Sequence, residues 1–146
     1  MAVEIRQVQD KSELKRFVQF GNELYKKNPY HVPMLIDDEL GTLDKDRNPA
    51  FEFCEAAYFL AYRNGRIVGR IAGIINHRAN ETWNQSNARF GFLDFINDNA
   101  VVDALFEVVE NWARSKGMEM LQGPMGFTDM DKEGMLIEGF DQLGTM

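Results

Sequence analysis

Two strand-like runs joined by Asn64-Gly65 constrain the fold of this chain more than any other feature. Residues 58–63 are rich in aromatic side chains, and residues 66–75 are rich in isoleucine and valine. Both residues of an Asn-Gly pair tolerate the positive φ angles of a type I′ turn, which joins antiparallel strands tightly. The sequence therefore predicts a long β-hairpin, in which Gly69 and Gly73 mark a bulge or a close backbone approach.

The segments before the hairpin are predicted to form a strand and two helices. Residues 2–8 alternate loosely between apolar and polar side chains, as a short strand does. Asp10 and Glu13 have the spacing of a capping box, and apolar residues then recur at helical spacing over residues 11–26. Residues 35–43 have the composition of a further short helix.

The segments after the hairpin predict a strand–helix–strand unit, which makes parallel neighbours in a sheet. The helix has apolar residues at helical spacing, and Gly117 lies where a C-cap glycine belongs. The predicted elements are an asparagine-rich loop over 76–89, a strand over 90–96, a helix from Asn97 or Asp98 to Lys116, a strand over 118–122 and a polar, glycine-spaced tail over 123–146.

Length and charge exclude several classes of protein. The 146 residues fit one domain, and a net charge of −7 argues against binding to nucleic acid or to an anionic membrane. The single cysteine, Cys54, forms no internal disulfide and no cysteine zinc cluster. Neither a signal peptide nor a run of about 20 apolar residues is recognisable, so we expect a cytoplasmic protein with no membrane partner.

Two segments carry a resemblance to a known family. Residues 57–69, AYFLAYRNGRIVG, look like the second and third strands of the GCN5-related N-acetyltransferase (GNAT) family. Residues 104–117, ALFEVVENWARSKG, look like the helix that follows the acyl-CoA-binding strand of that family. Together with the N-terminal strand and helix, the resemblance covers residues 3–122.

The resemblance implies a mixed α/β fold with three layers, α/β/α. Its central sheet is mostly antiparallel and contains one parallel strand–helix–strand unit. We expect a single, incomplete domain over 1–146, divided into 1–55, 56–122 and 123–146. The fold needs another helix and about two more strands, so either a missing C-terminal portion or a second copy in a homodimer completes the sheet. A vaguer resemblance to larger, uncharacterised GNAT-like proteins rests on Gly123-Pro124, Phe127-Thr128, Gly134, Leu136-Ile137 and Gly139-Phe140-Asp141.

The resemblance also implies an acyl-CoA-dependent N-acyltransferase that acts on a small amine, with acetyl-CoA or another acyl-CoA as cofactor and no metal. The family binds the pyrophosphate with the pattern Arg/Gln-x-x-Gly-x-Gly/Ala. The matching residues, which are the predicted cofactor-binding residues, are Phe95, Ile96, Asn97, Asp98 and Asn99, and they contain no glycine. Asp94, Asp98 and Asp103 add negative charge there, and Asp98 can cap the helix in the ordinary way.

Catalytic and substrate-binding candidates are few. Asp94, on the strand that carries the chemistry in this family, is the candidate base, although such an Asp can also be the solvent-facing member of an alternating strand. No tyrosine follows Tyr62, so the tyrosine acid of the family is missing. Ligands bind beyond the carboxyl ends of strands in open α/β sheets, so the loop after residue 122 is a candidate pocket wall. The alternative is that this loop is a plain Gly-Pro turn. The candidate substrate-binding residues of this loop are Gly123, Met125, Gly126 and Phe127.

Two alternative functions compete with this prediction. One is a non-catalytic domain of the same fold that binds a ligand or supports a partner in a longer protein. The other is calcium binding by residues 44–55, where Glu55 takes the twelfth position but Pro49 takes the position that needs glycine. His31 and His77 have no metal-ligand spacing, so we predict no metal site.

Overall fold

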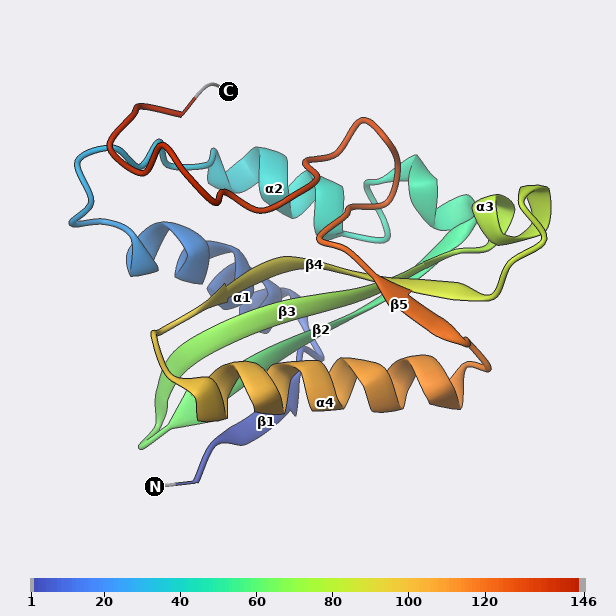
Figure 1. Ribbon diagram of the computed structural model, residues 1–146, viewed down its shortest axis with the longest axis horizontal. Coiled ribbons are helices and arrows are strands. Elements are labelled where there is room, and N and C mark those ends of the chain that lie inside the picture. The colour runs from blue at the N-terminus through green and yellow to red at the C-terminus, as the bar shows by residue number, and fades with distance from the viewer. Residues whose placement is uncertain (1, 145–146) are drawn as a thin grey trace.

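The computed structural model describes residues 2–144, which form one five-stranded sheet in the order β1-β2-β3-β4-β5 (Figure 1). Neighbouring strands are antiparallel except β4 and β5, which are parallel. In chain order the elements are β1 (Glu4–Gln7), α1 (Lys11–Leu24), α2 (Ile36–Leu43), the short 3₁₀ helix η1 (Pro49–Glu52), β2 (Cys54–Arg63), β3 (Arg66–Asn76), α3 (His77–Thr82), β4 (Asn87–Phe95), α4 (Asn99–Ser115) and β5 (Met120–Gln122).

The predicted hairpin is confirmed and forms the centre of the sheet. Strands β2 and β3 pair from Cys54–Asn76 to Arg63–Arg66, and the turn residues Asn64 and Gly65 have φ angles of 54° and 75°. These positive angles are those of a type I′ turn, whose twist matches that of the strands.

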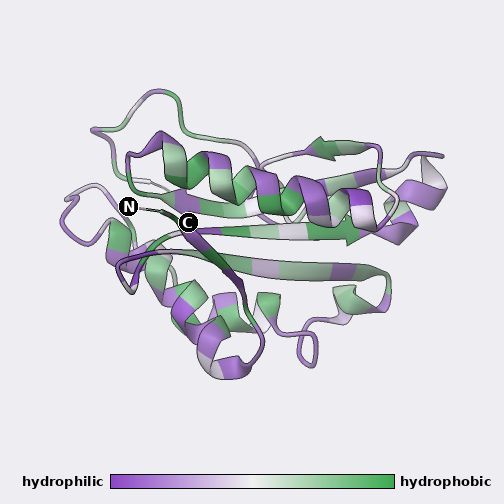
Figure 2. Cartoon of the chain, turned by 90° about the horizontal axis from the view of Figure 1, so that it is seen from below, coloured by the Kyte–Doolittle hydropathy of each residue, from purple (hydrophilic) through white to green (hydrophobic). Residues whose placement is uncertain are grey.

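Helices cover both faces of the sheet, so the predicted three-layer α/β/α fold is confirmed (Figure 1). Helices α1 and α2 pack on one face, and α4 packs on the other through Val101, Leu105 and Val109. Figure 2 shows hydrophobic and hydrophilic residues alternating along α4, as expected of a helix with one buried side. Gly73 allows the approach of α4, because a Cβ there would lie 2.7 Å from the Trp112 ring.

The helix starts follow the predicted caps. At α1, the side chain of Asp10 accepts a hydrogen bond from the backbone N–H of Glu13, and the carboxylate of Glu13 reaches back to the N–H of Gln9, each over 2.8 Å. These two bonds satisfy backbone donors that have no partner inside the helix. The predicted capping box is therefore present, with its return bond made one residue earlier than the cap.

One prediction is wrong: residues 76–89 are not a single loop. The side chain of Asn76 accepts a hydrogen bond from the N–H of Ala79 and starts the short helix α3. Strand β4 begins at Asn87, where the chain pairs with β5 on one side and soon with β3 on the other. Local polarity predicted a loop, but side-chain capping and pairing across the sheet decided the structure.

The residues after β5 contain no helix or strand up to residue 144, yet they begin in close contact with the sheet. Phe127 is fully buried in the core formed by α1, η1 and the hairpin. The segment then runs back alongside α2 (Figure 1). Among residues 2–144, no helix has the length and the apolar composition needed to cross a membrane.

Candidate functional site

The outer edge of β4 is open over its second half. Strand β5 pairs only with Asn87, Ala88 and Arg89, and beyond these residues Met125 donates one backbone bond of 2.9 Å to the carbonyl of Phe90. Within residues 2–144, no strand pairs with the outer edge from Phe92 to Phe95. Unpaired backbone groups at a sheet edge can pair with an extended ligand.

A β-bulge lies at the point where β4 and β5 separate. Gly91 pairs with Ala72 and Asp94 pairs with Arg70, so two residues of β4, Phe92 and Leu93, oppose one residue of β3. Phe92 has a φ of 49°, which is uncommon for a residue with a side chain. Bulges of this kind redirect the side chains that follow. Here the next side chain of β4 on the sheet face covered by α1 and α2 is that of Asp94.

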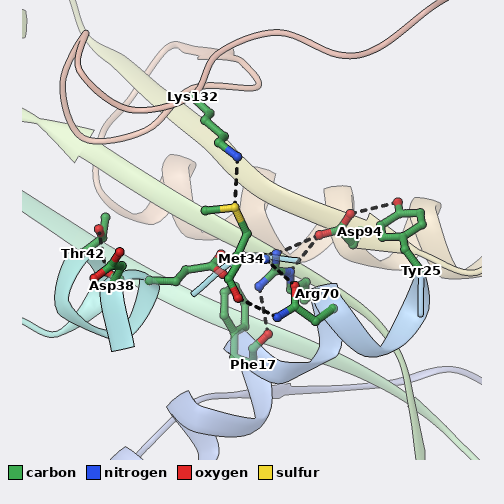
Figure 3. A network of polar contacts seen from close by, with 10 residues as sticks. Phe17, Tyr25, Met34, Asp38, Thr42, Arg70, Asp94 and Lys132 are labelled. Atoms are coloured by element: carbon green, nitrogen blue, oxygen red, sulfur yellow. Dashed lines mark hydrogen bonds and ion pairs between the residues drawn. The ribbon is translucent and has the colours of Figure 1, made fainter. Parts of the chain in front are cut away.

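Arg70 of β3 and Asp94 of β4 form the centre of a polar cluster on the face of the sheet that α1 and α2 cover (Figure 3). Nε and Nη2 of Arg70 each lie 2.9 Å from Oδ2 of Asp94. Nη1 of Arg70 donates to the carbonyl oxygen of Phe17 over 3.0 Å. The Arg70 side chain is 6% exposed and that of Asp94 is 18% exposed, so most of this ion pair lies out of water.

Glu39 of α2 joins the same guanidinium from the other side. Its Oε1 lies 3.4 Å from Nη2 of Arg70, and its side chain is 5% exposed. Burial raises the pKa of Glu39, and the nearby charge of Asp94 raises it further, while Arg70 opposes both. Gly21 leaves space for the cluster, because a Cβ there would lie 2.4 Å from Nη2 of Arg70.

Tyr25 brings a hydroxyl group to the free oxygen of Asp94. The residue follows α1, and its hydroxyl donates to Oδ1 of Asp94 over 2.9 Å. Burial, followed by the charge and the hydrogen bond of Asp94, raises the pKa of Tyr25 to about 12. The ring of His31 packs against Tyr25 at 5.2 Å, and the buried Nε2 of His31 has no hydrogen-bond partner within residues 2–144.

The start of α4, where the predicted cofactor-binding residues lie, is capped by the protein itself. Oδ1 of Asp98 accepts from the N–H of Ala100 over 2.9 Å, and Oδ2 accepts from Arg63 of β2 over 2.5 Å. The hydrogen bond from Arg63 has the larger effect on the pKa of Asp98 and lowers it, and the bond from Ala100 lowers it further. A diphosphate at this helix end would meet an ionised carboxylate. Of the five predicted residues, Phe95 ends β4, Asp98 caps α4 and Asn99 begins it, and their part in cofactor binding stays a prediction.

The predicted substrate-binding loop packs tightly against β4. A Cβ on Gly91 would lie 2.1 Å from the carbonyl oxygen of Met125, and one on Gly123 would lie 2.2 Å from that of Phe90. Arg89, which is 7% exposed, donates from Nη1 to the carbonyl oxygens of Gly126 and Phe127 over 3.1 and 3.2 Å. The loop is therefore fixed beside the open edge of β4, and its part in substrate binding stays a prediction.

Other predicted candidates lie away from this cluster. The thiol of Cys54 is buried, faces the carbonyl of Phe127, and has its pKa raised by burial to about 11, as expected of a structural cysteine. In the calcium-like segment, Glu55 contacts His77 at 2.7 Å and Lys116 at 2.9 Å. Within residues 2–144, no three His, Cys, Asp or Glu side chains are grouped to hold a metal.

Arg70, Glu39, Tyr25 and His31 were not predicted as site residues. The sequence does hold one signal, because Arg70 is a charged residue within an apolar strand, and a buried charge needs a partner. Nothing in the sequence identifies that partner. Tyr25, Glu39 and Asp94 belong to three separate elements that only the packing of α1 and α2 brings together.

Curated relatives match nearly all of the chain. Protein YghO of Escherichia coli is 33% identical over 137 residues, which are 94% of this chain and 35% of YghO. The bacterial ceramide synthase of Caulobacter vibrioides is 33% identical over 135 residues, which are 92% of this chain and 35% of the synthase. The chain thus spans about a third of the length of these relatives. No protein-family model matches it.

Solved structures are similar in fold at low sequence identity. A tandem GNAT protein from the clavulanic acid biosynthesis pathway has a TM-score of 0.63 at 17% identity, over 82% of this chain and 35% of that one. A predicted acetyltransferase with acetyl-CoA from Clostridium acetobutylicum has a TM-score of 0.58 at 12% identity, over 95% and 97%. An aminoglycoside acetyltransferase from a soil metagenome has a TM-score of 0.56 at 13% identity, over 82% and 75%. The chain therefore has the fold of the GCN5-related N-acetyltransferases.

Proposed function

We propose that this chain takes part in acyl transfer from an acyl-CoA thioester to an amine nitrogen. The observation that carries the proposal is the open edge of β4 from Phe92 to Phe95, which includes Asp94 and its contact with Tyr25. The pantetheine arm of CoA is extended and contains amide groups, so it can pair with a free strand edge as a further strand does.

The edge of β4 fits the pantetheine arm of CoA better than the start of α4 fits its diphosphate. The edge of β4, ending in Phe95 and Ile96, offers unpaired backbone groups to the arm. Asn97, Asp98 and Asn99 are the candidates for the diphosphate end, but the Asp98 cap occupies the N–H of Ala100 and adds a negative charge. Binding there requires the carboxylate to move aside or to be screened, so we derive no catalytic step from the diphosphate.

Acyl-CoA, when bound, would supply an activated acyl group, whose bond to sulfur breaks as the bond to the amine nitrogen forms, with CoA leaving as the thiol or thiolate. Asp94 is the proposed acceptor of the proton that the amine loses on acylation. Its Oδ2 is held by Arg70, so Oδ1 is the oxygen available, and Tyr25 is already hydrogen-bonded to it. Arg70 and Glu39 act as positioning residues, since Arg70 holds Asp94 directly and the buried Glu39 contacts the same guanidinium. Gly123, Met125, Gly126 and Phe127 form the proposed wall beside the open edge.

Two classes of acceptor amine are compatible with the similar proteins. Aminoglycosides are polar, water-soluble amines, whereas ceramide is a lipid in which a fatty acyl group is joined to the nitrogen of a long-chain base. The alternative to catalysis is a GNAT-fold domain that binds its ligand without turning it over. The two are separated by comparing binding with product formation.

Calorimetric titration with CoA, acetyl-CoA and palmitoyl-CoA tests the proposal directly. We expect saturable binding, and Asp98→Asn should strengthen it about twofold to fivefold because one repelling charge is removed. Asp103→Asn, an exposed position on the same helix, is the control and should change the affinity less. Absence of binding to every member of the panel would exclude the acyl-CoA reading of this chain.

Product formation is measured separately, with mass spectrometry of the amide after incubation with a panel of amines. Transfer that is lost in Asp94→Asn but kept in Asp103→Asn supports the role of Asp94. Binding of acyl-CoA without any amide product, in the presence of both polar and long-chain amines, would favour the non-catalytic alternative.

A further inference from the structure

The segment of residues 130–143 exposes an unusual number of large apolar side chains. Met130 is 94% exposed and Ile137 is 82% exposed, in a stretch that contains no helix or strand. Single exposed apolar residues are normal, but a dense group of them marks a surface that contacts something apolar. The exposed members of this segment, named here the apolar tail segment, are Met130, Met135, Leu136, Ile137, Phe140 and Leu143.

The apolar tail segment lies on the same side of the sheet as the polar cluster. Nζ of Lys132 lies 3.0 Å from Sδ of Met34. The backbone of Met34 is joined to the side chain of Asn22 in α1 by two hydrogen bonds of 2.8 and 2.9 Å. Figure 3 shows the Lys132 side chain reaching toward Met34, in the same view as the Arg70–Asp94 pair. Leu35, which follows Met34 in the chain, is itself an exposed large apolar residue, with 64% of its surface accessible.

Charge restricts what this surface can contact. Residues 129–143 include five acidic side chains and one lysine, and Asp37 and Asp38 of α2 lie exposed nearby. A surface with this balance repels anionic lipid headgroups and fatty acid carboxylates, and it attracts ammonium groups. An apolar surface bordered by negative charge is complementary to a molecule with a cationic head and a hydrocarbon chain.

We propose that the apolar tail segment, together with Leu35, binds the hydrocarbon chain of a long-chain amine whose ammonium group is directed toward Asp94. The acceptor role of this amine rests on the proposed function, and the similarity to a ceramide synthase agrees with an acceptor of this class. Binding of the amine does not depend on acyl transfer, so the two proposals can fail separately.

Alkylammonium ions below their micelle concentration provide the first test. We expect dodecylammonium to bind saturably in calorimetry, and binding to weaken about fourfold for each methylene removed, as burial of methylenes requires. Dodecanoate, which has the same kind of chain and the opposite charge, should bind at least tenfold more weakly. Equal affinity for dodecylammonium and 1,6-diaminohexane, or for dodecylammonium and dodecanoate, would overturn the proposal.

Substitutions in the apolar tail segment test whether dodecylammonium binds there. Ile137→Gln combined with Phe140→Gln should reduce the affinity for dodecylammonium at least tenfold. Trp83→Gln is the matched control, because Trp83 is 73% exposed but lies just beyond α3. Equal binding by the double variant and the control would exclude the apolar tail segment. A wild-type chain that self-associates in sedimentation, while the double variant is monomeric and neither binds the amine, would show that a second copy covers this surface instead.

Failure of the proposed function gives a different pattern. In that case no acyl-CoA binds and no amide forms, while dodecylammonium still binds the wild-type chain and the Trp83→Gln control. Conversely, acyl transfer to polar amines only, with no binding of dodecylammonium, supports the proposed function and excludes the long-chain acceptor.

Discussion

Arg70 on β3 contacts Asp94 on the neighbouring strand β4 with two nitrogens, Nε and Nη2, each 2.9 Å from the same carboxylate oxygen. This arrangement leaves the second oxygen of Asp94 to Tyr25 and links the sheet to α1 and α2. Removal of any member is expected to affect the others, because groups in one buried network do not act independently.

Arg70→Leu should destabilise the fold by about 3–5 kcal/mol, since it leaves Asp94 and the buried Glu39 without a cation. Urea denaturation followed by circular dichroism measures this loss. Arg66→Leu is the control, because Arg66 is exposed next to the hairpin turn, and it should stay within about 0.5 kcal/mol of the wild type. Similar losses in both variants would contradict the central role of Arg70.

Glu39→Gln should make the fold more stable than the wild type as the pH rises. The pKa of Glu39 is raised in the folded state above its ordinary value of 4.5, so its favourable contribution is present below pH 4.5 and is lost as the pH rises through the folded pKa. Glutamine stays neutral and avoids that loss. Thermal unfolding between pH 4 and 8 should show the melting temperature of Glu39→Gln rising relative to that of the wild type as the pH increases. Asp38→Asn, an exposed neighbour, should show no such trend.

Asp94→Asn should lower the pKa of Tyr25 from about 12 toward 10. Burial of Tyr25 remains in the variant, but the carboxylate that opposes formation of the phenolate is gone. ¹³C-tyrosine NMR during an alkaline titration, with the signal assigned by Tyr25→Phe, measures the change. An unaltered titration of Tyr25 in Asp94→Asn would contradict the hydrogen bond between them.

Asp98→Ala should lower the melting temperature at neutral pH by removing the cap of α4. The pKa of Asp98 is lowered in the folded state, so its contribution is present above the ordinary value of 3.8 and is lost as the pH falls through the folded pKa. The deficit of the variant should therefore shrink in strong acid. Asp103→Ala, within the same helix, serves as the comparison, and a deficit independent of pH would point to a cause other than the Arg63 and Ala100 contacts.

Gly91→Ala should destabilise the fold by about 1–3 kcal/mol and displace the loop that follows β5, because the new Cβ would lie 2.1 Å from the carbonyl oxygen of Met125. Limited proteolysis should cut residues 123–131 faster in this variant. Gly144→Ala, which meets nothing within 4 Å, should leave both stability and cleavage unchanged. Wild-type behaviour of Gly91→Ala would show that the loop adapts without cost.

Local signals determined much of the fold. The Asn64-Gly65 turn, the Asp10 and Asp98 caps and the helical spacing of α1 and α4 each act over a few residues, so the sequence alone identifies them. The helix α3 was missed, because its cap is an asparagine in a stretch whose composition otherwise favours a loop.

The candidate site was determined only in part by the sequence. Asp94 was identifiable from its place on the predicted strand, and the structure confirms the expected cap of α4 by Asp98. The partners of Asp94 could not be identified, because they come from α1, α2 and β3. Side-chain contacts between distant segments depend on how the layers pack, and no local pattern encodes that packing. The sequence specified the hairpin and the helices, and only the tertiary structure brought Tyr25, Glu39 and Arg70 to Asp94.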